Sequence, residues 1–355
     1  MSQDSVAPSS TFNGWIGFDK NAIKGNLVHT TFEPKPFTDN DIDVEITHCG
    51  VCASDLHTLR SGWAKSDYPV VVGHEIVGNV IRKGKNVNHL NIGDRVGIGA
   101  QSSSCLACDE CKTDNEQYCD NMVQTYNDRY PDGSKTYGGY ATHGRFPAAF
   151  AFPIPDSLQS AIAAPMLCGG VTMYSPLKRY GAGPGKSVGI VGIGGLGHFG
   201  VLFASALGCD NVVAVSRSRS KEVDVKVMGA NKIIATQEEN WDVNNAATLD
   251  LIVCTANDPE IEVSSYALLL RRGGILVQVG APEDVLKFNP MPLIFKNRSI
   301  AGTVIGSRKE IKEMLELAVK KNIKSWIQEY PMDQVNKVIV KMNTTGARYR
   351  YVLVN

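Results

Sequence analysis

The chain contains 355 residues, a length that suits two domains, each with its own hydrophobic core. Hydrophobic residues make up 43% of the sequence and charged residues 20%, a mixture that is typical of globular proteins and excludes a disordered chain. Lys+Arg and Asp+Glu both number 36, so the formal net charge is +0, and the sequence has no basic run that would indicate a nucleic-acid binder or a polybasic membrane binder.

The sequence predicts a cytoplasmic protein without membrane segments. Its first fourteen residues are polar and lack the apolar core of a signal peptide. The long apolar stretch at residues 188–207 is interrupted by His198 and is rich in glycine, which favours a strand, a tight loop and a helix over a membrane span. Nine cysteines without a secretory signal indicate reduced thiols, and their clustering favours metal binding over disulfides.

From about residue 14 to residue 155 the sequence predicts short strands separated by turns. Ile42, Val44 and Ile46 alternate with polar residues, the pattern of a half-buried strand. Glycine-rich turns separate further strand signals at residues 70–72, 76–81 and 95–98. We therefore expect an irregular β domain here.

Beyond about Pro155 short apolar runs alternate with helix-compatible segments. Helices are predicted at residues 198–207 and 221–228, the second of which is stopped by Gly229. Strands that alternate with helices predict a parallel sheet covered on both faces, the doubly wound α/β plan. The six predicted strands are residues 188–191, 212–215, 232–235, 250–254, 275–279 and 299–304.

A helical stretch at residues 309–321 and a final strand at residues 348–354 follow the parallel sheet. We expect both to return to the first domain and complete it. The expected division is therefore residues 1–160 with 305–355 as one domain, and residues 161–304 as the other.

Four cysteines in the first domain, Cys105, Cys108, Cys111 and Cys119, have the spacing C-x2-C-x2-C-x7-C. Four thiolates within fifteen residues can surround one ion, and an all-cysteine tetrahedron is the closed form typical of structural zinc. An iron–sulfur cluster and inert thiols are the alternatives, although the bacterial ferredoxin run differs because it closes with x3 and Pro. The spacing favours structural zinc, which concerns stability and not catalysis.

A glycine motif, Gly192-Ile-Gly194-Gly195-Leu-Gly197, follows the strand predicted at residues 188–191 and opens a helix. This context favours a dinucleotide-binding loop over a glycine-rich turn with no ligand. The first glycine permits the tight turn, the second lets the backbone approach a pyrophosphate, and the helix N-terminus supplies positive dipole.

The segment after the second strand of the parallel sheet reads SRSRSK at residues 216–221. NAD-binding sites usually place an acidic residue here to hold the ribose hydroxyls, but nothing acidic occurs before Glu222. Hydroxyl and cationic groups favour the 2′-phosphate of NADP instead. A solvated basic turn is the alternative.

A scattered set of possible metal ligands comprises Cys52, His74 and Cys168. Two thiolates and one imidazole leave a fourth position open, which is the catalytic zinc pattern of alcohol dehydrogenases. Each residue alone is a weak signal, since a lone cysteine in an apolar segment such as Cys168 is commonly a core residue.

Five motifs in this order resemble those of the zinc-dependent medium-chain dehydrogenases. Within that superfamily the chain is most similar to the cinnamyl alcohol dehydrogenase group, and especially to the fungal NADP-dependent alcohol dehydrogenases of broad substrate range. The resemblance runs from about Gly14 to Val352. The motifs are GVCASDLH at 50–57, GHE at 73–75, the four-cysteine segment at 105–119, LCGG at 167–170 and GIGGLGH at 192–198.

The resemblance implies a GroES-like catalytic domain, which includes the structural zinc segment, and a Rossmann NADP-binding domain. It also implies reversible hydride transfer between NADPH and aromatic or medium-chain aliphatic aldehydes, two zinc ions per chain, and a homodimer paired through residues 299–304. A polyol or amino-alcohol dehydrogenase is one alternative, which Cys168 and the segment at 216–221 argue against. A non-catalytic NADPH-binding protein is the other, which the retained zinc ligands argue against.

The resemblance also assigns the catalytic site. Cys52, His74 and Cys168 would hold the catalytic zinc, and Glu75 would be a carboxylate that can approach the metal. Asp55 would orient His74 by accepting its free ring N–H.

Ser54 and His57 would relay the proton, whereas Cys49 would be structural. Ala53 occupies a place where some relatives carry a basic or histidine side chain near the pyrophosphate. Trp63 and Ile305 would line the substrate pocket. The implied cofactor contacts are Thr172, Gly192, Gly194, Gly195, Leu196, Gly197, Ser216, Arg217, Lys221, Thr255, Ile305 and Arg348.

Overall fold

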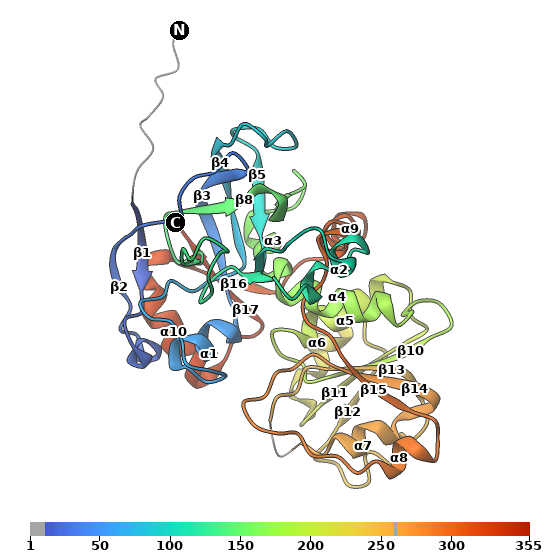
Figure 1. Ribbon diagram of the computed structural model, residues 1–355. Coiled ribbons are helices and arrows are strands. Elements are labelled where there is room, and N and C mark those ends of the chain that lie inside the picture. Colours follow the sequence, from blue (N-terminus) through green and yellow to red (C-terminus); the bar gives the residue numbers. More distant parts are fainter. Residues whose placement is uncertain (1–10, 259–260) are drawn as a thin grey trace.

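Two large β-sheets organise the chain, and Figure 1 shows them in separate lobes. The computed structural model describes residues 11–258 and 261–355. Residues 1–10, which include most of the polar stretch interpreted as lacking a signal peptide, lie outside the described residues. In the described part of the chain, none of the helices has the length and apolar character that crossing a membrane requires.

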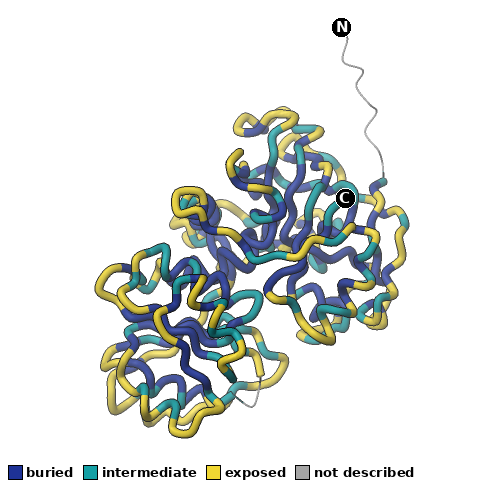
Figure 2. The backbone as a smooth tube through the Cα atoms, turned by 180° about the vertical axis from the view of Figure 1, so that it is seen from behind, coloured by how far each residue is buried: buried dark blue, intermediate teal, exposed yellow. Residues whose placement is uncertain are grey.

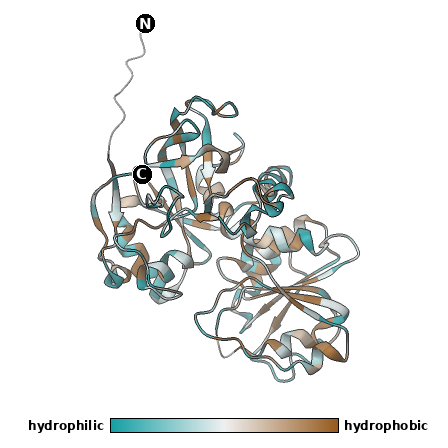
Figure 3. Ribbon diagram, in the orientation of Figure 1, coloured by the Kyte–Doolittle hydropathy of each residue, from teal (hydrophilic) through white to brown (hydrophobic). Residues whose placement is uncertain are grey.

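One lobe contains a six-stranded parallel sheet in the order β12-β11-β10-β13-β14-β15. In β11, Val212 and Ala214 pack into one hydrophobic cluster, whereas Val213 and Val215 pack into another. Both faces of the sheet are therefore buried, and its strands are largely apolar (Figure 3). The predicted doubly wound α/β plan is confirmed. The strands are β10 (Ser187–Val191), β11 (Asn211–Ser216), β12 (Lys232–Ala235), β13 (Leu249–Cys254), β14 (Leu270–Gln278) and β15 (Ser299–Gly302).

Helices cover both faces of this sheet. Buried residues of α4, α5 and α6 belong to one cluster, and those of α7 belong to the other. The predicted helices at 198–207 and 221–228 correspond to α5 and α6. The helical elements are α4 (Gly169–Arg179), α5 (Gly197–Ala206), η5 (Arg219–Lys221), α6 (Glu222–Val227), α7 (Val263–Leu268) and α8 (Met291–Ile294).

The strand β14 begins five residues before the predicted start at Ile275. Its first residue, Leu270, pairs with Leu249 of β13, and the register shifts between that pair and the next. The intervening Arg271 and Gly273 interrupt the apolar run, so the local sequence does not indicate a strand there.

The other lobe contains a mainly antiparallel sheet in the order β16-β17-β3-β4-β5-β9, with β8 also paired to β3. Its central strands β3, β4, β5 and β17 are mostly buried, whereas β16 at its edge is largely exposed. Figure 2 shows buried chain inside both lobes and exposed chain around them. The strands of this lobe are β1 (Phe12–Ile16), β2 (Val28–Phe32), β3 (Asp41–Val51), β4 (Ile76–Lys83), β5 (Arg95–Ile98), β6 (Gln101–Ser103), β7 (Val123–Gln124), β8 (His143–Pro147), β9 (Ala151–Pro153), β16 (Ile327–Pro331) and β17 (Arg350–Val354).

The helices outside the parallel sheet are short, apart from two near the C-terminus. They are η1 (Lys20–Lys24), α1 (Ala53–Arg60), α2 (Asp109–Lys112), η2 (Glu116–Tyr118), η3 (Ala148–Phe150), α3 (Ser160–Ala163), η4 (Ala164–Leu167), α9 (Arg308–Lys320), η6 (Met332–Gln334) and α10 (Val335–Thr345).

The prediction of a strand at residues 70–72 is wrong. Val70 forms only an isolated bridge with Gly17, and the carbonyls of Val71 and Val72 accept hydrogen bonds from the 138–140 loop. The apolar run is buried as expected. Its partners are single loop residues, so it forms no ladder.

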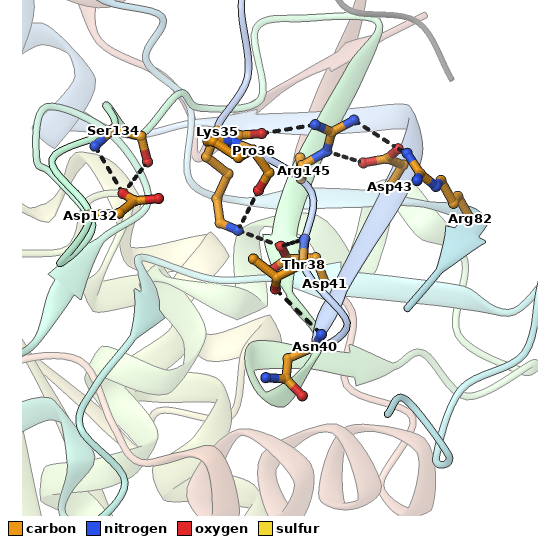
Figure 4. A network of polar contacts seen from close by, with 10 residues as sticks. All are labelled: Lys35, Pro36, Thr38, Asn40, Asp41, Asp43, Arg82, Asp132, Ser134 and Arg145. Atoms are coloured by element: carbon orange, nitrogen blue, oxygen red, sulfur yellow. Dashed lines mark hydrogen bonds and ion pairs between the residues drawn. The ribbon is translucent and has the colours of Figure 1, made fainter. Parts of the chain in front are cut away.

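Ion pairs hold the start of β3 to the segments beside it (Figure 4). Lys35 Nζ lies 2.5 Å from Asp41 Oδ2 at the start of β3. Arg145 on β8 binds Asp43 on β3 with a 2.7 Å Nε–Oδ1 distance, and Arg82 on β4 lies 3.8 Å from the same carboxylate. These pairs connect three neighbouring strands through one face.

The two predicted C-terminal elements pack in different places. The final strand, β17, joins the antiparallel sheet beside β3, as expected. The helix α9 packs Ile311, Met314 and Leu315 into a hydrophobic cluster that contains the parallel sheet and α4 but also includes Val77 and Phe152 of the antiparallel sheet. An amphipathic pattern shows that a helix has a buried face, but not which core the face enters. The domain division at residues 160 and 305 stays a prediction.

Candidate functional site

Three segments that are far apart in the sequence bring four possible metal ligands together. β3 ends at Val51, and Cys52 follows as the residue that precedes α1. His74 and Glu75 directly precede β4, and Cys168 directly precedes α4. All four side chains are buried, and their ligand atoms lie within 4.8 Å of one another. The two thiol sulfurs are 4.0 Å apart.

The charge balance and unpaired atoms of this cluster suit a metal ion. A hydrogen bond from Cys168 lowers the pKa of the Cys52 thiol well below its usual range, which favours the metal-binding thiolate. Burial opposes a charged imidazole at His74, but the hydrogen bond and charge of Cys52 raise its pKa to about 9. Nε2 of His74 and Oε2 of Glu75 are buried and find no hydrogen-bond partner among the residues that the structure describes. The residues therefore fit zinc with an open position.

Arg350 on β17 holds the Glu75 carboxylate beside the cluster. Its Nη2 donates to Oε1 of Glu75, and the N–H of Gly169 lies 3.4 Å from the same oxygen. Burial raises the pKa of Glu75 to about 7, although Arg350 opposes the rise. A Cβ atom at Gly50 would lie 2.0 Å from Glu75 Oε2, so glycine leaves the necessary room. The sequence gives no signal for this ion pair, whose members are 275 positions apart.

Asp55 supports the ligands through the backbone. Its carboxylate accepts hydrogen bonds from the N–H of Cys52 at 2.8 Å and the N–H of Gly73 at 3.1 Å. It also accepts the hydroxyl of Tyr140 at 2.8 Å, a contact that the sequence does not indicate. Among the described residues no hydrogen bond joins Asp55 to the His74 ring, which differs from the expected contact. The carboxylate instead holds the backbone beside both ligands.

The two residues expected to relay a proton follow on α1. Ser54 Oγ lies 3.6 Å from Cys52 Sγ, whereas Ala53 is exposed at the start of the helix. His57, almost one turn further along, stacks on Trp63 with ring centroids 4.3 Å apart. Trp63 is 46% exposed, and its Nε1 donates to a carbonyl of the other lobe. The structure thus places Ser54 beside the ligand cluster and His57 further along the same helix.

Cys49 lies in the hydrophobic core. It is fully buried, and its thiol donates to the carbonyl of Gly50 at 3.5 Å. It is not among the four clustered ligands, in keeping with the structural role expected from the sequence.

The second cysteine cluster consists of the four cysteines of the 105–119 segment, whose side chains converge. The four sulfur atoms lie within 4.8 Å of one another, with 3.5 Å between Cys105 and Cys119 and 3.9 Å between Cys105 and Cys111. The N–H groups of Ala107 and Cys108 point at the sulfur of Cys105 and lower its pKa to about 6. Four converging thiols with N–H support fit the closed coordination of structural zinc.

The glycine motif forms a tight loop between β10 and α5. Gly192 has φ +83°, a conformation that favours glycine, and a Cβ at Gly197 would lie only 2.0 Å from the Gly192 carbonyl. At Gly194 a Cβ would meet none of the described residues within 4 Å, so this side of the loop is open. The hydroxyl of Thr255 donates to the carbonyls of Val191 and Gly192 and braces the turn. The open backbone at the helix N-terminus fits a pyrophosphate.

Cationic side chains gather beyond the C-terminal end of β11. Lys221 Nζ donates to the Ile193 carbonyl of the glycine loop. Burial lowers the pKa of Lys221, and the nearby charges of Arg348 and Arg217 lower it further. Arg348 is itself paired with Asp224 at 2.7 Å, whereas Arg217 is exposed. These cations lie where the sequence places the 2′-phosphate of NADP.

The remaining expected cofactor contacts vary in exposure. Ser216 ends β11 and is half-buried, as are Leu196 and Gly195 of the glycine loop. Thr172 is buried in α4, and Ile305 is 9% exposed and belongs to a hydrophobic core cluster. The structure does not test their contacts with a cofactor or substrate, which stay predictions.

Two family matches cover most of the chain. Residues 38–156 match the family described as alcohol dehydrogenase GroES-like domain, and residues 195–320 match zinc-binding dehydrogenase. The first match spans most of the antiparallel sheet and the 105–119 cysteine cluster. The second begins within the glycine motif.

Individual relatives agree with these matches. The chain is 44% identical to NADP-dependent alcohol dehydrogenase 6 of Saccharomyces cerevisiae, covering 93% of this chain and 92% of the relative. A cinnamyl alcohol dehydrogenase of Sorghum bicolor superposes with a TM-score of 0.92 at 34% identity, covering 97% of each chain. The CAD of Helicobacter pylori, solved with NADP(H), gives 0.89 at 30% identity, covering 97% of this chain and 98% of that one. The chain therefore belongs to the zinc-binding alcohol dehydrogenase family.

Proposed function

We propose that this protein is a zinc-dependent, NADP(H)-dependent alcohol dehydrogenase that interconverts alcohols with aromatic or medium-chain aliphatic aldehydes. The observation that carries the proposal is the buried cluster of Cys52, His74, Glu75 and Cys168, with two orphaned ligand atoms. The loop opening α5 and the cations beyond β11 support NADP(H) as cofactor. The yeast and sorghum relatives support the reaction class.

Each part of the site has a task in this reaction. Zinc bound by Cys52, His74 and Cys168 would polarise the carbonyl oxygen, while NADPH would supply the hydride. Ser54, beside the ligand cluster, donates a proton to the substrate oxygen in reduction and accepts one in oxidation. His57 exchanges that proton with the bulk solvent.

The 105–119 segment has a separate task. We propose that its four cysteines hold a structural zinc, which gives two zinc ions per chain. Because metal affinity at such a site adds directly to folding free energy, this ion stabilises the lobe that carries most of the catalytic ligands.

An assay of purified, zinc-loaded protein with a panel of carbonyl compounds tests the function. We expect NADPH oxidation with cinnamaldehyde, benzaldehyde and hexanal, and little or none with NADH or with ketose substrates of polyol dehydrogenases. Metal analysis on the same sample should give two zinc ions per chain. Tight NADPH binding with no turnover of any aldehyde would contradict the proposal and favour a non-catalytic NADPH-binding protein. A preference for ketoses would favour a polyol dehydrogenase.

We also propose that the protein is a homodimer, paired through the edge strand β15, and that it acts in the cytoplasm. An open strand edge is prone to pair with a second chain. On and beside this edge Ile300 is 37% exposed and Val304 45%, and Ile294 and Phe295 of the α8 region are 69% and 72% exposed. An isologous contact would bury these side chains and continue one sheet into the next.

Sedimentation analysis tests the dimer. The 38.4 kDa chain should sediment at twice that mass. The double variant Ile300→Lys with Phe295→Asp should sediment as a monomer, because both substitutions place charge in the contact. Val223→Lys is the matched control, since Val223 is 75% exposed on α6, away from this edge. A parent chain that is monomeric at micromolar concentration would contradict the proposal.

A further inference from the structure

His57 contacts a carboxylate of the other lobe. Its Nδ1 lies 2.5 Å from Oε1 of Glu283, which follows β14 in the lobe of the parallel sheet. Arg60, three residues further along α1, donates to the same oxygen from Nε at 2.9 Å and from Nη2 at 2.6 Å. His57 is only 6% exposed, so this contact occupies a nearly buried ring.

The hydrogen-bond partners of the His57 ring favour Nδ1 as the nitrogen that carries the proton. Arg60 Nη2 also lies 2.9 Å from Nδ1 of His57, but it has a nearer acceptor in Oε1 of Glu283 at 2.6 Å, so it does not need Nδ1 as an acceptor. If Nδ1 were unprotonated, it and the Glu283 oxygen would be two acceptors 2.5 Å apart with no hydrogen between them. Nδ1–H must therefore donate to Glu283. The neutral ring then has Nε2 as its one proton-accepting nitrogen.

Neighbouring features keep Glu283 in this position. Trp63 stacks on the His57 ring, and its Nε1 donates to the carbonyl of Ala281 at 3.0 Å, two residues before Glu283. At Gly62 a Cβ would lie 2.1 Å from Oε1 of Glu283, so the absence of a side chain there lets the carboxylate reach the ring.

We propose that Glu283 is a positioning residue of the proton relay, which holds the proton of His57 on Nδ1 and leaves Nε2 to exchange protons with the relay. The inference rests on the proposed function, because the relay has meaning only in an alcohol dehydrogenase. In oxidation, Nε2 accepts the proton released by the alcohol, and the resulting imidazolium is stabilised by the Glu283 carboxylate. In reduction the proton returns by the same path, so atoms and charge balance. Since His57 and Glu283 belong to different lobes, the relay is complete only when the lobes are together.

The charged groups around His57 change its pKa in opposite directions. Burial lowers the pKa of His57 below its ordinary value, Arg60 lowers it further, and Glu283 and the Cys52 thiolate raise it. Removing the Glu283 charge should therefore lower the pKa, and removing the Arg60 charge should raise it. Each shift should be about 1 pH unit, the lower end of the range for adjacent charges, because Glu283 is 36% exposed.

NMR titration of the His57 ring in zinc-loaded, cofactor-free protein tests the assignment without activity. His57→Gln identifies the signal among the seven histidines. In the parent protein the ring ¹⁵N shifts should report the Nδ1–H tautomer. The His57 titration should shift to lower pH in Glu283→Gln and to higher pH in Arg60→Gln. Asp284→Asn is the matched control, since it removes one negative charge from the same segment at an exposed position, and it should leave the titration unchanged.

The pH profile of kcat for alcohol oxidation should show the same order. Oxidation needs neutral His57, so kcat rises as the pH passes the pKa of His57. The rising limb should move to lower pH in Glu283→Gln and to higher pH in Arg60→Gln, and Asp284→Asn should match the parent.

Two results separate the inference from the proposed function. An unshifted His57 titration in Glu283→Gln, or an Nε2–H tautomer in the parent, would overturn the inference whatever the activity. A parent protein that shows the expected titrations but reduces no aldehyde would overturn the proposed function, and with it the relay, while the Nδ1 assignment would stand as a contact between the lobes.

Discussion

Cys168→Ala is expected to abolish aldehyde reduction while leaving a folded protein that still binds NADPH. Cys168 supplies one of two sulfurs in the buried ligand cluster, 4.0 Å from the sulfur of Cys52. Without it a catalytic zinc has too few protein ligands to be held and to polarise the substrate oxygen. Metal ions contribute several kcal/mol to such a transition state, so kcat should fall by about 10³-fold or more. Zinc content should fall from two ions per chain to one.

Two cysteine controls make this result specific. Cys49→Ala removes a thiol that is also buried and lies only three positions from Cys52, but is not among the ligands, so this variant should keep two zinc ions and turn over aldehydes. Cys108→Ala affects the other cluster and should lower the thermal unfolding temperature, because a structural metal contributes to stability. Normal turnover by Cys168→Ala would show that the assigned zinc site is wrong.

Ser216→Asp combined with Arg217→Ala is expected to reverse the cofactor preference. The first change places an acidic side chain at the end of β11, where it would repel a 2′-phosphate and bind ribose hydroxyls. The second removes an exposed guanidinium from the cationic group that includes Lys221. Charge-assisted hydrogen bonds contribute about 1.5–3 kcal/mol each, so two of them favour NADPH over NADH by roughly 10²- to 10⁴-fold. Solvent screening at this partly open position places the preference toward the lower value.

The ratio of kcat/KM for NADPH and NADH at one aldehyde concentration measures the preference. Arg219→Ala is the matched control in the same segment, because Arg219 is already paired with Glu238 at 2.6 Å and with Glu222 at 3.4 Å. It should leave the ratio unchanged. Near-equal use of the two cofactors by the parent protein would contradict the assignment of these cations to the 2′-phosphate.

The sequence predicts well those parts of the molecule whose structure depends on residues that are close together in the chain. The glycine motif is one, because the tight turn and the close approach of α5 involve residues only five positions apart. The strands of the parallel sheet are another, since each is a short apolar run. The two zinc clusters differ in this respect. Four cysteines in one segment indicate a site directly, whereas Cys52, His74 and Cys168 were joined only through resemblance to a family.

What the sequence does not indicate depends on contacts between distant segments. Glu75 meets Arg350 and His57 meets Glu283 across 275 and 226 positions, and neither partner stands out in its own segment. The role of Asp55 could not be predicted from the sequence either, because it follows from the N–H groups and the hydroxyl that the fold brings to its carboxylate. Burial and pairing of charged groups arise from the fold, so these residues could be found only from the structure.

The place of β17 in its sheet bears on the order in which the two lobes can form during synthesis. All six strands of the parallel sheet come from the stretch between Ser187 and Gly302, so they can pair before α9, which packs into the same cluster, and β17 have left the ribosome. β3 is made far earlier but must wait for β17 to cover its edge and for Arg350 to reach Glu75. Until then one edge of β3 lacks its partner strand, and Glu75, which precedes β4, lacks the guanidinium that pairs with it. The strands of the nucleotide-binding half are thus able to pair first, and the ion pair beside the metal ligands forms only when the last strand is added.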